Sequence, residues 1–360
     1  MKNKGRNGEI DILRFVFTLC VIFAHFKSQY ENVALLGRWN GHISVEFFFV
    51  LSGFLMVARA EKNSTEEPIW KKTLDFLHRK ISSLAPVYYA TLLFVVILYL
   101  SNSQMTVTNL RTYLTRLVPS LLFLSSQGLE ESTSIPFSWY ICSMLLAMFI
   151  IYPVLIILKR NYTCILAPLI SIFICAFAMQ QYGKLFMLQQ DWFVFFYPSL
   201  LRAILGINVG CIAYEISSHL KKTYSSKMTK VGRCFFTAIT ICMFLFPILW
   251  IIKGLDGRSH LCVLLMFGLG VAFCFSRLGF NLIGGQLTDF IGKFCLPLYL
   301  GQGLTMKLFP TYLASEWFGA VLYLLACFIV AFGLLFASKA FTIFGVHVQK
   351  TVKKICFVDK

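Results

Sequence analysis

Apolar residues in this chain form long, nearly unbroken stretches separated by short polar segments. An α-helix needs about 20 predominantly apolar residues to cross the hydrocarbon core of a bilayer, and each stretch approaches that length. Ten stretches predict ten transmembrane helices, over residues 11–28, 42–59, 84–100, 138–158, 163–180, 195–216, 234–252, 261–276, 286–309 and 318–338. The predicted fold is therefore an all-α polytopic membrane protein.

Some parts of the pattern are weaker. Glycines and Pro297 interrupt the eighth and ninth stretches. The run Leu117–Leu124 is too short to cross, so we expect it to lie at the membrane interface or to re-enter. The longest loop, about residues 101–137, leaves no room for a large soluble domain. We divide the chain into a membrane domain, residues 1–345, and a short basic cytoplasmic tail, residues 346–360.

Composition supports the membrane assignment. Of the 360 residues, 58% are hydrophobic and 14% are charged, and the mean hydropathy is +0.73. A soluble domain carries roughly a quarter charged residues. The 12 cysteines are scattered without metal-ligand spacing, so we expect neither a disulfide framework nor a metal site. The basic start, residues 1–6, leads into the first span without a small-residue cleavage site, so we expect no cleaved signal peptide.

The net charge of +17 is concentrated in the loops. If the N-terminus is cytoplasmic, the inner loops carry 23 Lys and Arg residues and the outer loops carry 8. Such an excess in short cytoplasmic loops sets the orientation of membrane proteins. The charges therefore predict a multi-pass protein of the inner or plasma membrane with both termini in the cytoplasm. They do not predict a protein that binds nucleic acid.

Two ionisable side chains interrupt the first predicted span. Arg14 and His25 lie within an otherwise apolar stretch, where a charge is costly, and each is a candidate functional residue for that reason. Their separation of eleven residues corresponds to about three helical turns, so both lie on one face of the helix, about 16 Å apart along its axis. The pair predicts a polar track through the bilayer.

The second predicted span begins with His42 and Glu46. Because this span runs back from the outer side, Glu46 starts at the depth of His25. A carboxylate beside an imidazole fixes its tautomer and raises its basicity, which suggests a dyad of His25 as base and Glu46 as its orienter. Two alternatives stay open: Glu46 caps the start of its helix, or His42 is its partner and a second-choice base.

Five blocks of sequence form a recognisable set. They are Asp11-Ile-Leu-Arg14 followed by ten residues and His25, Ser44–Phe54, Phe76–Tyr88, Ser138-Trp-Tyr140 leading to Tyr152-Pro153, and Ile291–Leu300. Together they resemble the integral-membrane acyltransferases of acyltransferase family 3. The resemblance extends over nearly the whole chain and includes the plan of ten spans.

The resemblance implies a reaction and a set of roles. Members of this family take an acyl group, often acetyl, from cytoplasmic acyl-CoA and deliver it to a hydroxyl of a cell-surface glycan or another acceptor. It implies catalytic roles for Arg14 and His25, and a donor site for the CoA phosphates at Arg79 and Lys80. Arg14 is then expected to bind the donor as well, by holding donor charge or the thioester oxygen at the cytoplasmic end. Clustered Arg and Lys suit a polyanionic donor. Acetyl-CoA is then a substrate, and we expect no bound cofactor.

Three positions depart from the family pattern. Ser83 stands where a second Arg is usual, the block Trp139–Met144 lacks a Glu, and Tyr299-Leu-Gly-Gln302 replaces a Tyr-Leu-x-His pattern. The departures concern secondary positions, because the first block retains both its Arg and its His.

Other residues are candidates for acceptor binding. Arg202, in the outer half of span six, either neutralises an acceptor carboxylate or phosphate or pairs with Glu46. Trp139 and Tyr140 open span four, where they form an interfacial aromatic belt or stack on a sugar. His42 also lies at this depth. The pair Ser52-Gly53 predicts close helix packing rather than a catalytic serine.

The sequence thus favours a membrane O-acyltransferase that moves an acetyl group from acyl-CoA to a surface polysaccharide or a lipid-linked glycan. One alternative is a transporter or flippase that uses the same polar track, although no internal repeat relates the two halves of the chain. Another is an acyltransferase with a non-glycan acceptor, such as a small amine or an antibiotic.

Overall fold

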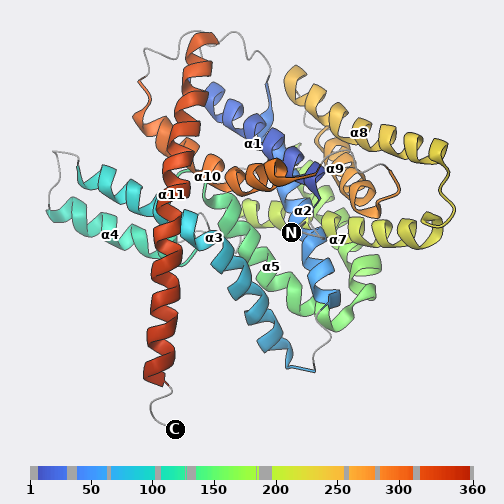
Figure 1. Ribbon diagram of the computed structural model, residues 1–360, viewed down its shortest axis with the longest axis horizontal. Coiled ribbons are helices and arrows are strands. Elements are labelled where there is room, and N and C mark those ends of the chain that lie inside the picture. The colour runs from blue at the N-terminus through green and yellow to red at the C-terminus, as the bar shows by residue number, and fades with distance from the viewer. Residues whose placement is uncertain are drawn as a thin grey trace.

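The protein is a bundle of α-helices (Figure 1). The computed structural model describes residues 7–30, 39–62, 66–101, 107–125, 127, 135–183, 185, 197–254, 259–279, 284–310 and 317–356, and these contain no strand. The α-helices are α1 Gly8–Gln29, α2 Ser44–Lys62, α3 Ile69–Leu100, α4 Val107–Leu121, α5 Trp139–Leu158, α6 Ala167–Tyr182, α7 Pro198–Tyr224, α8 Lys230–Lys253, α9 Ser259–Ser276, α10 Gln286–Leu308 and α11 Trp317–Cys356. A short 3₁₀ turn, η2 (Gly41–Ile43), precedes α2, and a π-helical turn, η3 (Tyr162–Leu166), precedes α6.

Every predicted span corresponds to one of these helices. Eight described helices are long and apolar enough to cross a membrane, and α1 and α10, which carry more polar residues, account for the first and ninth predicted spans. The prediction of an all-α polytopic membrane protein is therefore confirmed. The basic start that we expected to carry no cleavage site, residues 1–6, lies outside the described residues.

Local sequence signals fix several helix ends. Asn7 caps α1, because its side-chain oxygen accepts hydrogen bonds from the backbone N–H groups of Glu9 and Ile10 at 3.1 and 3.4 Å. The side chain of Thr229 caps α8 in the same way. Pro198 occupies the first turn of α7, where its missing N–H has no helical partner to lose. The cap at Asn7 sets the point at which α1 begins, three residues before Asp11 in its first turn.

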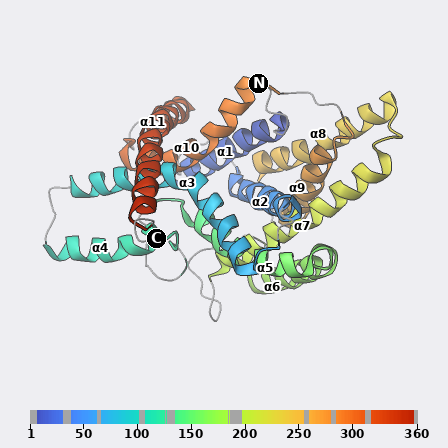
Figure 2. The same cartoon turned by 60° about the horizontal axis from the view of Figure 1, so that its bottom comes forward.

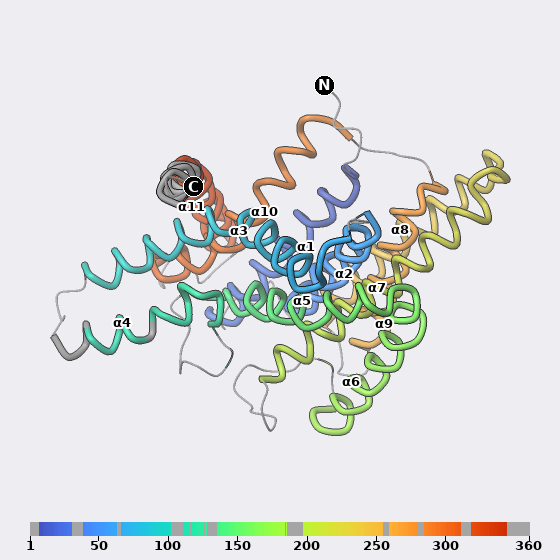
Figure 3. The backbone as a smooth tube through the Cα atoms, turned by 90° about the horizontal axis from the view of Figure 1, so that it is seen from below, coloured from blue at the N-terminus to red at the C-terminus, as the bar shows by residue number. Residues whose placement is uncertain are grey.

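Helices α2 and α7 form the centre of the bundle. In the most apolar part of each, 72% and 67% of residues are buried, against 17% in α8. Figures 1 and 2 show α3 and α4 at one end of the long axis and α8 at the other, with α1, α2 and α7 between them. The tube in Figure 3 shows α11 almost end-on, beside α10. The central pair therefore carries side chains that are shielded from lipid by the surrounding helices.

Glycines bring α2 and α7 into backbone contact. A Cβ on Gly53 of α2 would lie 2.0 Å from the carbonyl oxygen of Ile207, and a Cβ on Gly210 of α7 would lie 2.0 Å from that of Val50. Small residues at such spacing allow membrane helices to approach closely. The close packing predicted at Ser52-Gly53 is thus confirmed, and it sets the distance across which side chains of the two helices meet.

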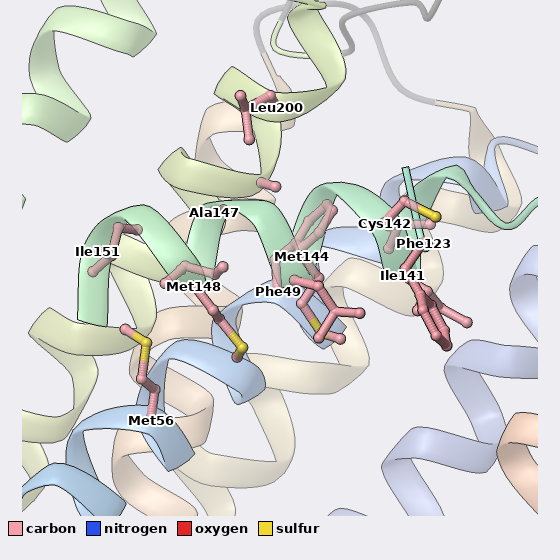
Figure 4. Packing of buried hydrophobic residues seen from close by; sticks show 14 of the residues in the cluster. Phe49, Met56, Phe123, Ile141, Cys142, Met144, Ala147, Met148, Ile151 and Leu200 are labelled. Atoms are coloured by element: carbon pink, nitrogen blue, oxygen red, sulfur yellow. The ribbon is translucent and has the colours of Figure 1, made fainter. Parts of the chain in front are cut away.

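Helix α5 fills the space beside this pair. Figure 4 shows its side chains Met144 and Met148 pointing toward α2, where Phe49 and Met56 lie in the same buried cluster. Leu200 at the start of α7 belongs to this cluster as well. The packing places the first turn of α5 next to the start of α7.

Helices α3 and α4 form an antiparallel hairpin. The ring of Tyr99 stacks on Tyr113 with centroids 3.7 Å apart, and the hydroxyl of Tyr88 donates to the carbonyl of Ser120 at 2.8 Å. The chain after α4 therefore returns along α3 to the depth of Tyr88, where Phe123 stacks on that ring. That the short run Leu117–Leu124 re-enters or lies at the membrane interface stays a prediction.

The last helix is longer than its predicted span. Helix α11 continues from Trp317 to Cys356, so most of the segment that we assigned to a basic tail, residues 346–360, extends the helix. Residues 357–360 lie outside the described part of the chain.

Candidate functional site

A cavity of about 600 Å³ with a mostly apolar lining lies between α1, α2, α3, α5, α9 and α10. Its walls combine charged and hydroxyl side chains with apolar ones. The residues that line it are Asn7, Ile10, Asp11, Arg14, Thr18, Phe48, Leu51, Ser52, Leu55, Lys80, Ser83, Leu84, Val87, Tyr140, Ile141, Met144, Phe275, Gly292, Lys293, Cys295, Leu296 and Tyr299. The cavity is large enough for a sizeable part of a small-molecule substrate.

Three cations line this cavity from three helices. Arg14 comes from α1, Lys80 from α3 and Lys293 from α10. Arg14 Nη1 lies 3.3 Å from Oδ1 of Asp11, which is itself buried and occupies the same wall. One carboxylate against three cations leaves the wall with a net positive charge, which suits an anion.

The sequence departures Ser83 and Met144 also lie on the cavity wall. Ser83 donates its hydroxyl to the backbone carbonyl of Lys80 at 2.8 Å and so adds no charge. The Met144 sulfur accepts hydrogen bonds from the hydroxyls of Ser52 at 3.2 Å and Tyr140 at 3.6 Å. A cation that the family pattern places at Ser83 is absent there, and Lys293 supplies one from α10.

His25 is not among the residues that line the cavity. It is 9% exposed, and its Nδ1 lies 3.1 Å from Oε1 of Gln302 on α10. The ring of Phe137 stacks on the imidazole with centroids 3.7 Å apart and planes 10° from parallel. The imidazole of His42 lies on another side, with centroids 5.1 Å apart. His25 is thus held by contacts from three separate segments.

Tyr299 connects the cavity to His25. Its side chain lines the cavity, and its hydroxyl donates to the carbonyl of Phe137 at 3.0 Å. Phe137 has a φ of +64°, a backbone conformation that is unusual for a residue with a side chain, and its ring is the one that stacks on His25. Tyr299 and Phe137 therefore link the wall of the cavity to the imidazole.

Glu46 and Arg202 form a buried ion pair across α2 and α7. Arg202 Nε lies 2.6 Å from Oε1 of Glu46, and Nη2 lies 2.7 Å from Oε2. Nη2 also donates to the carbonyl of His42 at 3.0 Å, and the guanidinium lies over the ring of Trp139, 5.1 Å from its centroid. The side chains of Arg202 and Glu46 are 2% and 4% exposed.

The structure brings together most of the predicted site residues, in two groups. Arg14, Lys80 and Tyr140 line the cavity, whereas His25, His42, Glu46, Arg202 and Trp139 contact one another in a separate cluster. Arg79 is exposed and lies outside the cavity wall.

The predicted pairing of Glu46 with His25 is replaced by another. Both carboxylate oxygens of Glu46 bind Arg202, which was the alternative proposed for that arginine, and the side-chain hydrogen bond of His25 goes to Gln302. The depth of Glu46 was inferred from topology, but the direction of its side chain depends on how α2 is rotated against α7.

Sequence reasoning missed some residues of the site. Lys293 was counted only as a loop charge, and Phe137 precedes its helix in a long loop that gave no signal. Gln302 was noticed only as a departure from a pattern. The spacing Gly206-x-x-x-Gly210, one turn after Arg202, is a small-residue motif that would have indicated the contact with α2. Among the described residues, no group of three His, Cys, Asp or Glu side chains is placed to hold a metal ion.

The fold and the cavity define a multi-pass membrane protein whose helices enclose a polar site. The chain matches the family model described as an acyltransferase domain over residues 7–338, and it belongs to acyltransferase family 3. It is a membrane acyltransferase. No curated protein and no solved structure matches the chain.

Proposed function

We propose that this membrane acyltransferase moves an acetyl group from cytoplasmic acetyl-CoA to a hydroxyl of a cell-surface polysaccharide or a lipid-linked glycan. The observation that carries the proposal is the cavity with Arg14, Lys80 and Lys293 on its wall, which Tyr299 and Phe137 link to His25. The proposal places the protein in the inner or plasma membrane, with the N-terminal end of α1 on the cytoplasmic side.

The three cations support a CoA donor. Phosphates are recognised by Arg and Lys through charge-assisted hydrogen bonds, and CoA carries several of them. The pantetheine arm of CoA is long and flexible, so the phosphates of CoA can lie at the cations while its thioester lies at the part of the cavity that Tyr299 lines. The third cation on the cavity wall is Lys293 in place of Arg79, which was expected to contact the CoA phosphates.

His25 is proposed as the base. The acceptor hydroxyl oxygen attacks the thioester carbonyl, so that a C–O bond forms and the C–S bond breaks. The hydroxyl proton passes to His25 and then to the departing CoA thiolate, which leaves as the thiol. Positioned general bases of this kind contribute about 10²–10⁴-fold to a rate.

The identity of the acceptor rests on the resemblance to the family. Arg202 has both Glu46 oxygens and the Trp139 ring as neighbours, which favours a structural role over recognition of an acceptor anion. Trp139 and Tyr140 remain the aromatic candidates for contact with a sugar, with His42 nearby. An acceptor without charge fits this cluster best, which favours a sugar hydroxyl.

Donor binding separates this proposal from a transporter or flippase. We expect CoA and acetyl-CoA to raise the apparent melting temperature of the purified protein, because a ligand stabilises the state that it binds. Absence of any shift at millimolar donor would contradict the acyl-CoA donor.

The reaction is tested by substitution. His25→Ala and Arg14→Ala should each abolish acetylation of the cell-envelope glycans, measured by mass spectrometry, at unchanged protein level. Acetylation retained in both variants would refute the proposed site. Acetylated small amines in place of glycans would identify the other class of acceptor.

A further inference from the structure

Gln302 is a fully buried polar residue beside the proposed base. It lies in the middle of α10 with no measurable exposure, and its Oε1 is 3.1 Å from Nδ1 of His25. The hydroxyl of Tyr323 on α11 donates to the backbone carbonyl of Gln302 at 3.2 Å. Both the side chain and the backbone at this position are therefore held in place.

The contact with His25 explains why a polar glutamine side chain is buried at position 302. The amide nitrogen of Gln302 has no hydrogen-bond partner within the described part of the chain. A buried donor left without a partner costs about 1–3 kcal/mol. An apolar residue of similar size would avoid this cost but could not make the hydrogen bond to the imidazole of His25.

Within the described part of the chain, the side-chain hydrogen bond of His25 is the one with Gln302. Both carboxylate oxygens of Glu46 bind Arg202, and the carbonyl of His42 accepts from the same guanidinium. Phe137 contacts His25 through the face of its ring. Gln302 is thus the hydrogen-bond partner that the structure provides for Nδ1.

An amide oxygen can only accept. Nδ1 of neutral His25 must therefore carry the proton in this contact, and the lone pair that can take a substrate proton is on Nε2. In the other tautomer the amide oxygen and the Nδ1 lone pair would face each other. The hydrogen bond selects one tautomer without adding a charge to the buried site.

We propose that Gln302 is the positioning residue of His25: it fixes the ring and holds the proton on Nδ1, so that Nε2 is the base. The inference rests on the proposed role of His25 in acyl transfer. It assigns to a neutral amide the task that a carboxylate performs in many catalytic dyads.

The test compares Gln302→Leu with Gln302→Glu. Leucine keeps the approximate volume but cannot accept the Nδ1 proton, so kcat for transfer of labelled acetyl from acetyl-CoA to envelope glycan in membranes should fall about 10- to 100-fold. KM for acetyl-CoA should stay within about twofold, since its phosphates bind elsewhere. Thr305→Val, one turn along α10, is the matched control, because the Thr305 hydroxyl bonds the helix backbone at Gly301.

The Gln302→Glu variant tests the role of Gln302 through the pH–rate profile, which a purely structural role would leave unchanged. A carboxylate at position 302 still accepts from Nδ1 and stabilises the imidazolium over the neutral ring, so the ascending limb of the pH–rate profile moves to higher pH. The other charged or titratable groups here are His42 from η2, whose ring contacts His25, and Arg202 and Lys27, which interact with His42. These are unchanged in the variant.

The outcomes are distinguishable. Wild-type kcat and pH profile in both Gln302 variants, while His25→Ala is inactive, would overturn the role of Gln302 and leave the proposed function standing. Full activity in His25→Ala would instead overturn the proposed function. If Gln302→Leu fails to fold, the pH–rate profile of Gln302→Glu is the test. An ascending limb at the same pH as in the wild type would overturn the inference.

Discussion

The guanidinium of Arg202 holds both carboxylate oxygens of Glu46, at 2.6 and 2.7 Å, across the contact of α2 and α7. The two charges are almost completely buried, and each satisfies the other in a fixed two-point geometry. The same guanidinium reaches the carbonyl of His42, so the pair also anchors the turn that leads into α2. This relationship joins the two central helices beside the proposed base.

Breaking this pair should destabilise the protein strongly. Glu46→Gln leaves the Arg202 charge buried without a counterion, and removal of one partner of a buried pair costs about 3–5 kcal/mol. Thermal unfolding in detergent measures the loss. Arg160→Gln is the control, since Arg160 is exposed and its nearest contact with Glu215 is 3.8 Å, and it should cost less than about 1 kcal/mol.

The double variant Glu46→Gln with Arg202→Met sharpens the same prediction. With both charges removed, the loss should be smaller than that of Glu46→Gln alone, because no unpaired charge remains. A double variant that is as unstable as the sum of the single variants would show that the ion pair is not what links the helices.

The glycine contact predicts sensitivity at two positions. Gly53→Ala and Gly210→Ala each place a methyl group 2.0 Å from a backbone carbonyl oxygen of the facing helix, so the helices must separate. We expect a loss of about 1–3 kcal/mol and reduced activity.

Gly333→Ala on α11 is the matched glycine control. A Cβ at this position would have no described neighbour within 4 Å, and alanine is the better helix former by about 1 kcal/mol, so stability should be unchanged or increased. Equal losses at all three glycines would mean that the close approach of α2 and α7 is not what makes Gly53 and Gly210 necessary.

The cationic wall predicts how donor affinity changes. Lys80→Gln and Lys293→Gln should each weaken acetyl-CoA binding about fivefold or more and reduce its dependence on salt, because fewer charges are then screened. Isothermal titration at two ionic strengths measures both effects. Lys222→Gln, exposed on α7 and outside the cavity wall, should bind like wild type.

Cysteine labelling can test the membrane orientation that the loop charges predict. In a background with the exposed Cys164, Cys234 and Cys262 replaced by Ser, a membrane-impermeant maleimide should label Ser101→Cys but not Ser226→Cys in intact cells. Both serines are exposed at helix ends on opposite sides of the predicted membrane. The reverse labelling pattern would invert the topology and with it the side on which the donor binds.

The helices were predictable because the length of an apolar run is a local property. The limits of the runs were less informative, since α3 begins at Ile69, well before its apolar stretch at residue 84, and α11 continues past residue 338. In both cases the extension is amphipathic or basic, and it forms a helix without being apolar. Periodicity and length therefore located the spans but not the ends of the helices.

The individual residues of the site were predictable from the sequence, but their contacts with one another were not. A charge in an apolar run marks Arg14, His25, Glu46 and Arg202 whatever their neighbours are. Which of them meet depends on helix rotation, and the contact of His25 with Gln302 joins residues 277 positions apart. Without knowledge that α10 lies beside α1, the carboxylate expected at the same membrane depth, Glu46, was the reasonable partner for the imidazole.

The length of the uncharged part of α11 matches the thickness of the membrane. Its stretch 317–338 holds no charged residue and measures about 33 Å, close to the hydrocarbon thickness of about 30 Å, and Lys339 follows at once. From there the helix runs on for about 27 Å to Cys356. A fluorescent protein or affinity tag fused to the C-terminus would therefore stand clear of the lipid headgroups, which makes that end the one to extend for purification and imaging.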